Sequence, residues 1–293
     1  MRLATYRGSD GPRLGIVTRP DGAETVVDAA NIDERATSVE AVLRGDADGL
    51  LHALESAVAA GLDKGVALAD VELLAPIARP GKLIAVGRNY REHAAEEGAA
   101  PPSTPVLFTK YPSSITGPGT EIQWRAADSS EVDYEAELGV IIGRRTRDVA
   151  AADALDAVLG YTCLNDVSAR DMQVQDGQWV RAKSLDTFCP MGPWIVTRDE
   201  LPDPGRLSIR CTVNGEVRQD ASTADLIHGV AELIAFCSRF FTLEPGDVIA
   251  TGTPGGVGAF RVPPVFLADG DVVAVSIEGI GTLENVCRVD ADR

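Results

Sequence analysis

The stretch Asp133-Tyr134-Glu135-Ala136-Glu137-Leu138-Gly139-Val140-Ile141-Ile142-Gly143 joins acidic side chains directly to an apolar run. That run is short and closed by a glycine, which predicts a buried β-strand. Glu135 and Glu137 are two residues apart, so on a strand they project to the same face, about 7 Å from each other. Two carboxylates at the mouth of an apolar strand repel each other unless a cation or a proton lies between them. The stretch alone leaves a second interpretation open, in which both carboxylates are solvated at a strand end.

A second strand-like run ends in another carboxylate. Residues 161–166 read Tyr-Thr-Cys-Leu-Asn-Asp, and Asp166 closes the run. Three carboxylates without a histidine favour a hard, oxygen-seeking ion, Mg²⁺ or Mn²⁺ rather than Zn²⁺. Three protein ligands on an octahedral ion leave positions for water and substrate, as catalysis requires.

Three further segments carry residues suited to chemistry. His93 and Glu96 are three residues apart, and on a helix the carboxylate can hold the imidazole as a general base, although an ordinary surface pair has the same spacing. Lys183 lies among small and apolar neighbours in residues 179–187, a pattern that also suits an exposed lysine. Residues 251–258 are rich in glycine but lack the ending of a P-loop and the spacing of a dinucleotide site. We expect them to form a loop that contacts the substrate.

The whole chain has the pattern of a β-rich α+β protein in two parts. Residues 1–75 predict a small N-terminal α+β domain, with strands at 14–17 and 25–28 and a helix at 39–59. Prolines at 76 and 80 mark the boundary, and residues 76–293 predict a domain of many short strands with glycine and proline turns. The expected features of this second domain are a short helix at 89–97, a proline-rich lid at 98–105, a hairpin turn at Asn214-Gly215, and a helix at 226–241 that is capped at Ser222 or Thr223 and carries a packed His228.

The composition excludes several classes of protein. Asp and Glu number 44 against 27 Lys and Arg, a formal charge of −17, and no basic run is present to bind nucleic acid. Neither a signal peptide nor a membrane-spanning segment is recognisable, so we expect a cytoplasmic protein. The five widely spaced cysteines predict reduced, mostly buried thiols.

Six segments taken together resemble the fumarylacetoacetate hydrolase family, over about Gly81 to Val289. No single segment is decisive, but six in the family's order and with suitable spacing are highly specific. They are Gly-Arg-Asn-Tyr at 87–90 with His93 and Glu96, Phe-Thr-Lys at 108–110 before Pro-Ser-Ser at 112–114, Asp-Tyr-Glu-Ala-Glu at 133–137, residues 165–173, Lys-Ser-Leu-Asp at 183–186, and residues 251–258.

The resemblance implies a mixed β-roll or sandwich domain, usually a homodimer, and a set of site residues. It implies one Mg²⁺ or Mn²⁺, sometimes Ca²⁺, on Glu135, Glu137 and Asp166, and it implies that His93 and Glu96 form a catalytic dyad. Lys183 would be a further catalytic residue, which contacts the substrate's oxygens and offsets the negative charge that develops there. Further substrate contacts are implied for Arg170, Gln173, Thr253 and Lys110. The chain resembles the three-carboxylate bacterial branch, which includes acylpyruvases and 2-hydroxyhepta-2,4-diene-1,7-dioate isomerases.

The first functional prediction is metal-dependent hydrolysis of a carbon–carbon bond in a 2,4-dioxo acid, such as an acylpyruvate or fumarylpyruvate. The metal would bind the carboxylate and the 2-oxo oxygen, and a water activated by His93 would attack the 4-carbonyl, leaving a metal-bound enolate. The same enolate also serves an oxaloacetate decarboxylase or an isomerase of unsaturated 2-oxo diacids, and both stay open. A remoter alternative is a metal-binding protein without catalytic activity.

Overall fold

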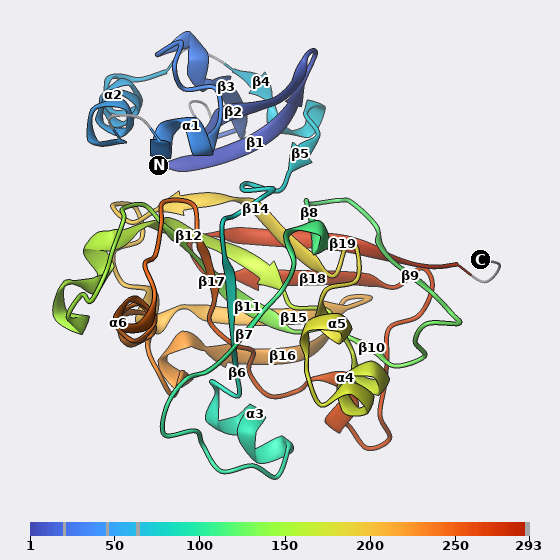
Figure 1. Cartoon of the computed structure of the whole chain (residues 1–293). Coiled ribbons are helices and arrows are strands. Elements are labelled where there is room, and N and C mark those ends of the chain that lie inside the picture. Colours follow the sequence, from blue (N-terminus) through green and yellow to red (C-terminus); the bar gives the residue numbers. More distant parts are fainter. Residues whose placement is uncertain (20–21, 45–46, 63–64, 291–293) are drawn as a thin grey trace.

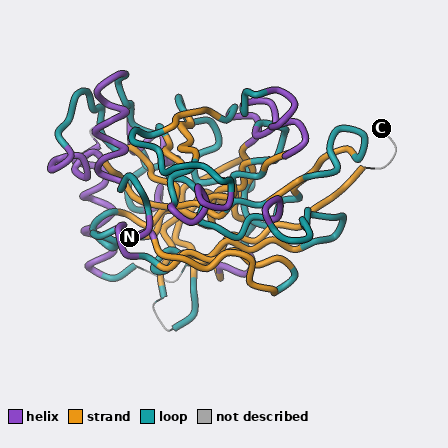
Figure 2. The backbone as a smooth tube through the Cα atoms, turned by 90° about the horizontal axis from the view of Figure 1, so that it is seen from below, coloured by secondary structure: helices purple, strands orange, loops and turns teal. Residues whose placement is uncertain are grey.

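The computed structural model describes residues 1–19, 22–44, 47–62 and 65–290 of the 293-residue chain. Strands cross its middle and short helices lie around them (Figures 1 and 2). The larger sheet has the order β4-β3-β2-β1-β14-β12-β11-β17-β6-β7, and β5 and β8 pair with β1 and β14. Its strands are β1 (Arg2–Gly8), β2 (Gly11–Thr18), β3 (Thr25–Asp28), β4 (Val66–Ala67), β5 (Leu73–Leu74), β6 (Leu83–Gly87), β7 (Val106–Thr109), β8 (Ile115–Thr116), β11 (Ala136–Ile142), β12 (Val158–Asn165), β14 (Cys189–Thr197) and β17 (Val248–Ala250).

A second sheet has the order β16-β15-β18-β19-β9 and packs on the larger one. Strands β15 and β18 alternate between more and less buried residues, because one face of this sheet packs inward and the other faces solvent. Every residue of β11, β12 and β14 is buried, since these strands lie in the middle of the larger sheet. The strands of the second sheet are β9 (Ile122–Arg125), β15 (Ser208–Val213), β16 (Glu216–Ser222), β18 (Val272–Ile277) and β19 (Gly281–Asp290), and a separate short pair is β10 (Val132–Asp133) with β13 (Ser168–Ala169).

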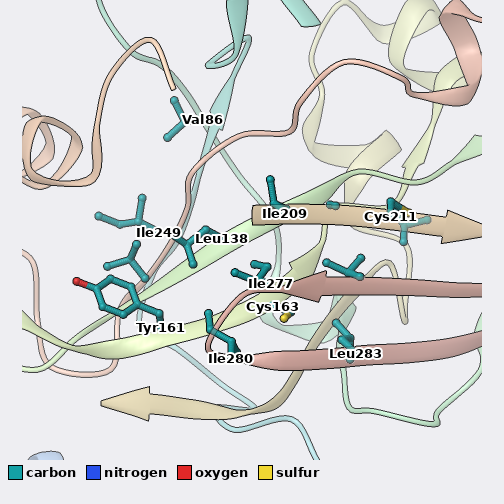
Figure 3. Close-up of a cluster of buried hydrophobic side chains, with 14 of the residues drawn as sticks. Val86, Leu138, Tyr161, Cys163, Ile209, Cys211, Ile249, Ile277, Ile280 and Leu283 are labelled. Carbon is teal, nitrogen blue, oxygen red and sulfur yellow. The ribbon is translucent and has the colours of Figure 1, made fainter. Parts of the chain in front are cut away.

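The core fills the space between the two sheets. Figure 3 shows Leu138 and Cys163 of the larger sheet facing Ile209, Ile277 and Leu283 of the second one. All five are buried, and the predicted β-rich α+β fold is confirmed. The expectation of buried, reduced cysteines is also met, because all five cysteines are buried and free.

The N-terminal part is continuous with the larger sheet. Arg2 and Leu3 of β1 pair with Val196 and Ile195 of β14, so one sheet runs through both predicted domains. A second apolar cluster joins Leu14 and other N-terminal side chains to residues beyond position 75, such as Ile141. In Figure 1 the N-terminal part lies at the top of the molecule and α3 at the bottom.

The helices lie around the sheets, and some of them differ from the sequence-based expectation. The predicted helix at 39–59 corresponds to two helices on either side of residues 45–46, which lie outside the described residues. The hairpin at Asn214-Gly215 is confirmed, with φ of 52° and 79° at its two central residues. The α-helices are α1 (Val39–Arg44), α2 (Ala47–Ala60), α3 (Arg91–Glu96), α4 (Arg170–Asp176), α5 (Val180–Lys183) and α6 (Val230–Phe240).

The predicted start of the helix at 226–241 is wrong. Ser222 does cap a helix, but this is a 3₁₀ turn over Thr223–Asp225, and α6 begins only at Val230 after Gly229. His228 therefore precedes the helix rather than lying on it, and its Nε2 is 3.2 Å from the carbonyl of Pro102. Within the described residues, no helix combines the length and apolarity needed to cross a membrane.

Candidate metal and substrate site

The three predicted carboxylates lie together and are buried. Glu135, Glu137 and Asp166 place one oxygen each within 4.8 Å of the other two. Antiparallel pairing brings this about, because Ala136 at the start of β11 pairs with Asn165 at the end of β12. The amide of Asp166 donates to the Glu135 carbonyl at 2.9 Å, and the amide of Glu135 donates to Oδ1 of Asn165 at 3.0 Å. The local backbone thus fixes the three side chains in one group.

Buried cations neutralise two of these carboxylates. Lys183 Nζ is 2.8 Å from Glu135 and 2.7 Å from Asp166, and Lys110 Nζ is 2.6 Å from the other oxygen of Asp166. Arg170 bridges Glu135, at 2.7 Å, and the buried Asp133, at 2.9 Å. Burial on its own would lower the pKa of Lys183, but its carboxylate partners outweigh this and raise the pKa. Lys183 is therefore held as a positive charge.

Glu137 differs from its neighbours, because among the described residues no Lys or Arg forms an ion pair with it. Its carboxylate accepts a hydrogen bond from the amide of Gly252 at 2.8 Å. Burial, followed by the nearby charges of Asp166 and Glu135, raises the pKa of Glu137 well above its usual value. Counting Asp133, four buried carboxylates thus face three buried cations. This excess of oxygen donors and negative charge fits a hard divalent cation, which would coordinate Glu135, Glu137 and Asp166.

His93 lies in α3 and is buried, but its nearer carboxylate partner is not the one predicted. Its Nε2 is 3.2 Å from Oε1 of Glu97, whereas its Nδ1 is 3.6 Å from Oε2 of Glu96. The first contact is within hydrogen-bond distance and the second is longer. Burial on its own would lower the pKa of His93, but Glu96 and Glu97 together raise it. The imidazole therefore tends to hold a second proton.

Glu97 and Arg88 are site residues that the sequence analysis missed. Arg88 Nε donates to Oε2 of Glu97 at 2.5 Å, so the chain of contacts runs from His93 through Glu97 to Arg88. The one available signal was the spacing of His93 and Glu97, which are four apart and hence neighbours on a helix. Glu96 has another role, because its Oε1 accepts from the amide of Gly256 at 2.6 Å and joins α3 to the glycine-rich loop.

Asn89 positions α3 over the carboxylates. Its side-chain amide donates to the carbonyls of His228 and Thr251, at 3.0 and 2.8 Å, and its oxygen accepts from the amide of His228 at 2.9 Å. The segment that carries His93 is thereby bound both to the chain before α6 and to the glycine-rich loop.

The glycine-rich loop lies against the site, and its Thr253 lines the cavity described below. Gly252 adopts a φ of 103°, which favours glycine, and a Cβ there would lie 2.7 Å from Cβ of Asn89. The hydroxyl of Thr253 accepts from Nε2 of Gln219 at 2.8 Å. Gln219 also accepts from the amide of Ala136 at 2.9 Å, so it connects the loop to the start of β11.

A narrow cavity brings together most of the predicted site residues. Those that line it are His93, Glu135, Glu137, Arg170, Gln173, Lys183 and Thr253. The other lining residues are Val86, Gly87, Arg88, Glu97, Phe108 and Trp179. Lys110 is outside this lining and buried, and its Nζ donates to Oδ1 of Asp166 and to the carbonyl of Val167. Its position therefore suits holding Asp166 in place better than the substrate contact that was predicted.

The chain is similar to known proteins over most of its length. Residues 82–288 match the family model described as fumarylacetoacetate (FAA) hydrolase C-terminal. A mitochondrial oxaloacetate tautomerase of Xenopus laevis is 42% identical over 292 residues, 97% of this chain and 89% of that protein.

Two solved structures are similar over almost their whole length. The first, 5-carboxymethyl-2-hydroxymuconate delta-isomerase from Mycobacterium smegmatis, has 41% identity and a TM-score of 0.77, with 100% of both chains covered. The second, maleylpyruvate hydrolase from Sphingobium sp. SYK-6 in complex with manganese(II) and pyruvate, has 36% identity and a TM-score of 0.81, with 99% of both chains covered. The chain described here belongs to the fumarylacetoacetate hydrolase family.

Proposed function

We propose that this protein is a divalent-metal-dependent enzyme that moves a proton at the carbon next to the carbonyl of a 2-oxo acid. We propose keto–enol tautomerisation of a small 2-oxo acid such as oxaloacetate as its reaction. The observation that carries this proposal is the position of His93, buried between Glu96 and Glu97 and lining one cavity with Glu135 and Glu137. An imidazole whose pKa is raised by two carboxylates suits a proton donor to an enol carbon better than a base toward water.

The chain's own residues supply the remaining steps. A divalent cation on Glu135, Glu137 and Asp166 would act as a Lewis acid that polarises the 2-oxo group. Lys183, held positive, would offset negative charge on the substrate's oxygens. His93 would give its proton to C3 of the enol while the enol hydroxyl loses its proton to solvent. Solvent then reprotonates His93, so no proton is gained or lost overall.

A second candidate function is the hydrolysis of acylpyruvates. One observation favours it: among the described residues, the buried Nδ1 of His93 has no hydrogen-bond partner, so this nitrogen is available to take a proton as a general base. Glu96 is the nearest carboxylate to that nitrogen, at 3.6 Å, in keeping with the predicted dyad. The similarity to a maleylpyruvate hydrolase is consistent with this alternative.

A substrate panel tests the proposal. The enol of oxaloacetate, an acylpyruvate and an unsaturated 2-oxo diacid would be assayed by ultraviolet absorbance with Mg²⁺ and with Mn²⁺. We expect metal-dependent ketonisation of the oxaloacetate enol to be the fastest reaction. Acylpyruvate cleavage as the only metal-dependent reaction would contradict the proposal and support the second candidate.

The variant His93→Gln shows whether that reaction uses the imidazole. We expect kcat to fall by about 10²- to 10⁴-fold, the usual contribution of a general acid, while Mn²⁺ still binds. His52→Gln is the matched control, because His52 is 79% exposed in its side chain and lies in the N-terminal part. Full activity in His93→Gln would exclude His93 as the proton donor.

A further inference from the structure

Arg88 lines the cavity in a backbone conformation that is unusual for arginine. Its φ is +56°, in the left-handed region that residues other than glycine, asparagine and aspartate seldom adopt. Such conformations are strained and are concentrated at functional sites. The backbone conformation therefore marks Arg88 as a candidate functional residue of the cavity.

Packing holds the guanidinium of Arg88 at the cavity. It lies over the ring of Trp179, with its central carbon 5.8 Å from the ring centroid. Trp179 in turn packs on Gly87, where a Cβ would lie 2.4 Å from the indole. Glycine at 87 therefore allows the indole to approach the backbone and to support Arg88 from one side.

Only part of the guanidinium is used inside the protein. Nε donates to Glu97, and among the described residues the two terminal nitrogens of Arg88 have no hydrogen-bond partner. Side-chain exposure rises along the chain of contacts, from 5% for His93 through 17% for Glu97 to 38% for Arg88. Arg88 is thus a more exposed residue of the cavity lining, whereas Glu135 and Glu137 are buried residues of the same lining.

We propose that Arg88 binds the second carboxylate of a 2-oxo dicarboxylic acid, and so selects diacids over 2-oxo acids with one carboxylate. The inference rests on the proposed function, in which the first carboxylate and the 2-oxo group bind at Glu135, Glu137 and Asp166. The terminal nitrogens form a planar fork that matches a carboxylate in two parallel hydrogen bonds. Glu97 shares the charge of Arg88 and competes with the substrate for it.

An apolar substrate tail fits this end of the cavity less well. Phe108 and Trp179 form an aromatic wall, with ring centroids 5.2 Å apart, that an acyl tail could cover. A tail on that wall would also cover Arg88 and remove water from its terminal nitrogens without giving them an acceptor, which is unfavourable. A substrate carboxylate, by contrast, accepts hydrogen bonds from the terminal nitrogens in place of the displaced water.

Binding to the Mn²⁺-loaded protein tests this proposal without reference to activity. Calorimetry would measure oxalate, pyruvate and 2-oxoglutarate, where only the last is a 2-oxo acid with a distal carboxylate. We expect the wild type to bind 2-oxoglutarate more tightly than pyruvate. In Arg88→Gln that affinity should fall by about 10- to 100-fold while the affinities for oxalate and pyruvate stay the same. Arg91→Gln is the matched control, because Arg91 is exposed on α3 and outside the cavity lining.

Three results would overturn the role of Arg88. They are an unchanged affinity for 2-oxoglutarate in Arg88→Gln, an equal loss for oxalate in that variant, and a wild type that binds pyruvate as tightly as the diacid. Failure of the wild type to bind oxalate or pyruvate at all would instead refute the proposed function. Glu97→Gln supplies an independent arm, because removing the competing charge should tighten 2-oxoglutarate binding several-fold, and weaker binding would count against the proposal.

Discussion

Glu96 and Glu97 are adjacent acidic residues, yet they have different surroundings. Glu96 is bound to the amide of Gly256, while Glu97 joins the imidazole of His93 to the guanidinium of Arg88. Residues 93 and 97 are one helical turn apart, so their side chains lie on the same face, and the longer contact to Glu96 comes from the adjoining position. The acid–base properties of His93 therefore depend on both carboxylates.

The pH dependence of the reaction should reveal the contribution of Glu97. Burial lowers the pKa of His93, but Glu96 and Glu97, with the charge of Glu135, raise it above its ordinary value. The rate of a reaction that needs protonated His93 is therefore still high at the ordinary pKa of histidine, and it falls as the pH rises through the raised pKa. In Glu97→Gln the pKa falls, so we expect the alkaline limb of kcat to move to lower pH.

Profiles of kcat against pH for Glu97→Gln and for Glu92→Gln check this expectation. Glu92 is an exposed residue of the same helix and should leave the limb where it is. An unmoved limb in Glu97→Gln, or a shift to higher pH, would mean that Glu97 does not set the proton affinity of His93.

At this scale the sequence predicts groups better than individual contacts. The three carboxylates could be found because each lies at the end of an apolar strand, where a buried charge is costly unless a cation or a hydrogen-bond donor compensates it. Arg88 could not be assigned in the same way, since its role depends on a positive φ and on Trp179, which is 91 residues away in the chain. A motif identifies a residue but not the direction in which its side chain points. Lys110 was therefore predicted to contact the substrate, whereas its Nζ binds Asp166 in the structure.

The elements around the site are held by a few buried polar side chains, and Asn89 is one of them. In Asn89→Ala the backbone groups of His228 and Thr251 lose their partners, which should cost about 1–3 kcal/mol for a buried group left without one. Because α3 then loses its attachment, we also expect kcat to fall. Urea denaturation and kcat measure the two effects separately.

Asn285→Ala is a matched control for this prediction. Asn285 is also buried and donates to two backbone carbonyls, those of Gly117 and Thr120, at 2.9 and 2.8 Å. It should lower stability by a similar amount and leave kcat unchanged. Equal loss of kcat in both variants would show that Asn89 acts through stability alone.

Element types could be predicted from the sequence more reliably than element ends. The hairpin at Asn214-Gly215 was found because its turn requires positive φ at two successive positions, a strong local constraint. The start of α6 was misplaced because Ser222 is a good cap in either helix type, and the 3₁₀ turn it caps ends before the α-helix begins. A tertiary contact separates the 3₁₀ turn from α6, because the amide of His228 donates to the side chain of Asn89 instead of joining the helix.

For the molecule as a whole, the shared sheet makes the N-terminal part and the rest one structural unit. Leu14 is fully buried in a cluster that also contains Ile141 and Ile195. We expect Leu14→Ala to cost about 2–5 kcal/mol and to destabilise the whole chain. All three tryptophans, Trp124, Trp179 and Trp194, lie beyond residue 75, but Trp194 contacts Arg2, whose guanidinium carbon is 5.7 Å from the ring centroid. The comparison is therefore made in a Trp194→Phe background, in which Trp124 and Trp179 report on the part beyond residue 75.

Thermal unfolding followed by tryptophan fluorescence tests this cooperativity. A single transition that shifts to lower temperature in Leu14→Ala is expected if the two parts unfold together. An unshifted fluorescence transition, with an earlier loss of structure seen by circular dichroism, would show instead that residues 1–75 unfold independently.

Every proposed reaction depends on a cation at Glu135, Glu137 and Asp166, so Mn²⁺ binding is the most direct test. Calorimetry on the wild type should give one Mn²⁺ site per chain. Glu137→Gln should lower the Mn²⁺ affinity by more than about 100-fold, because loss of a residue that only hydrogen-bonds a metal ligand already lowers affinity by about 10- to 100-fold. Glu137 has a raised pKa without metal, so the neutral glutamine should leave the metal-free fold intact. Glu216→Gln, an exposed hairpin residue, should bind Mn²⁺ like the wild type. Equal Mn²⁺ affinity in Glu137→Gln and the wild type would contradict the metal site and the function built on it.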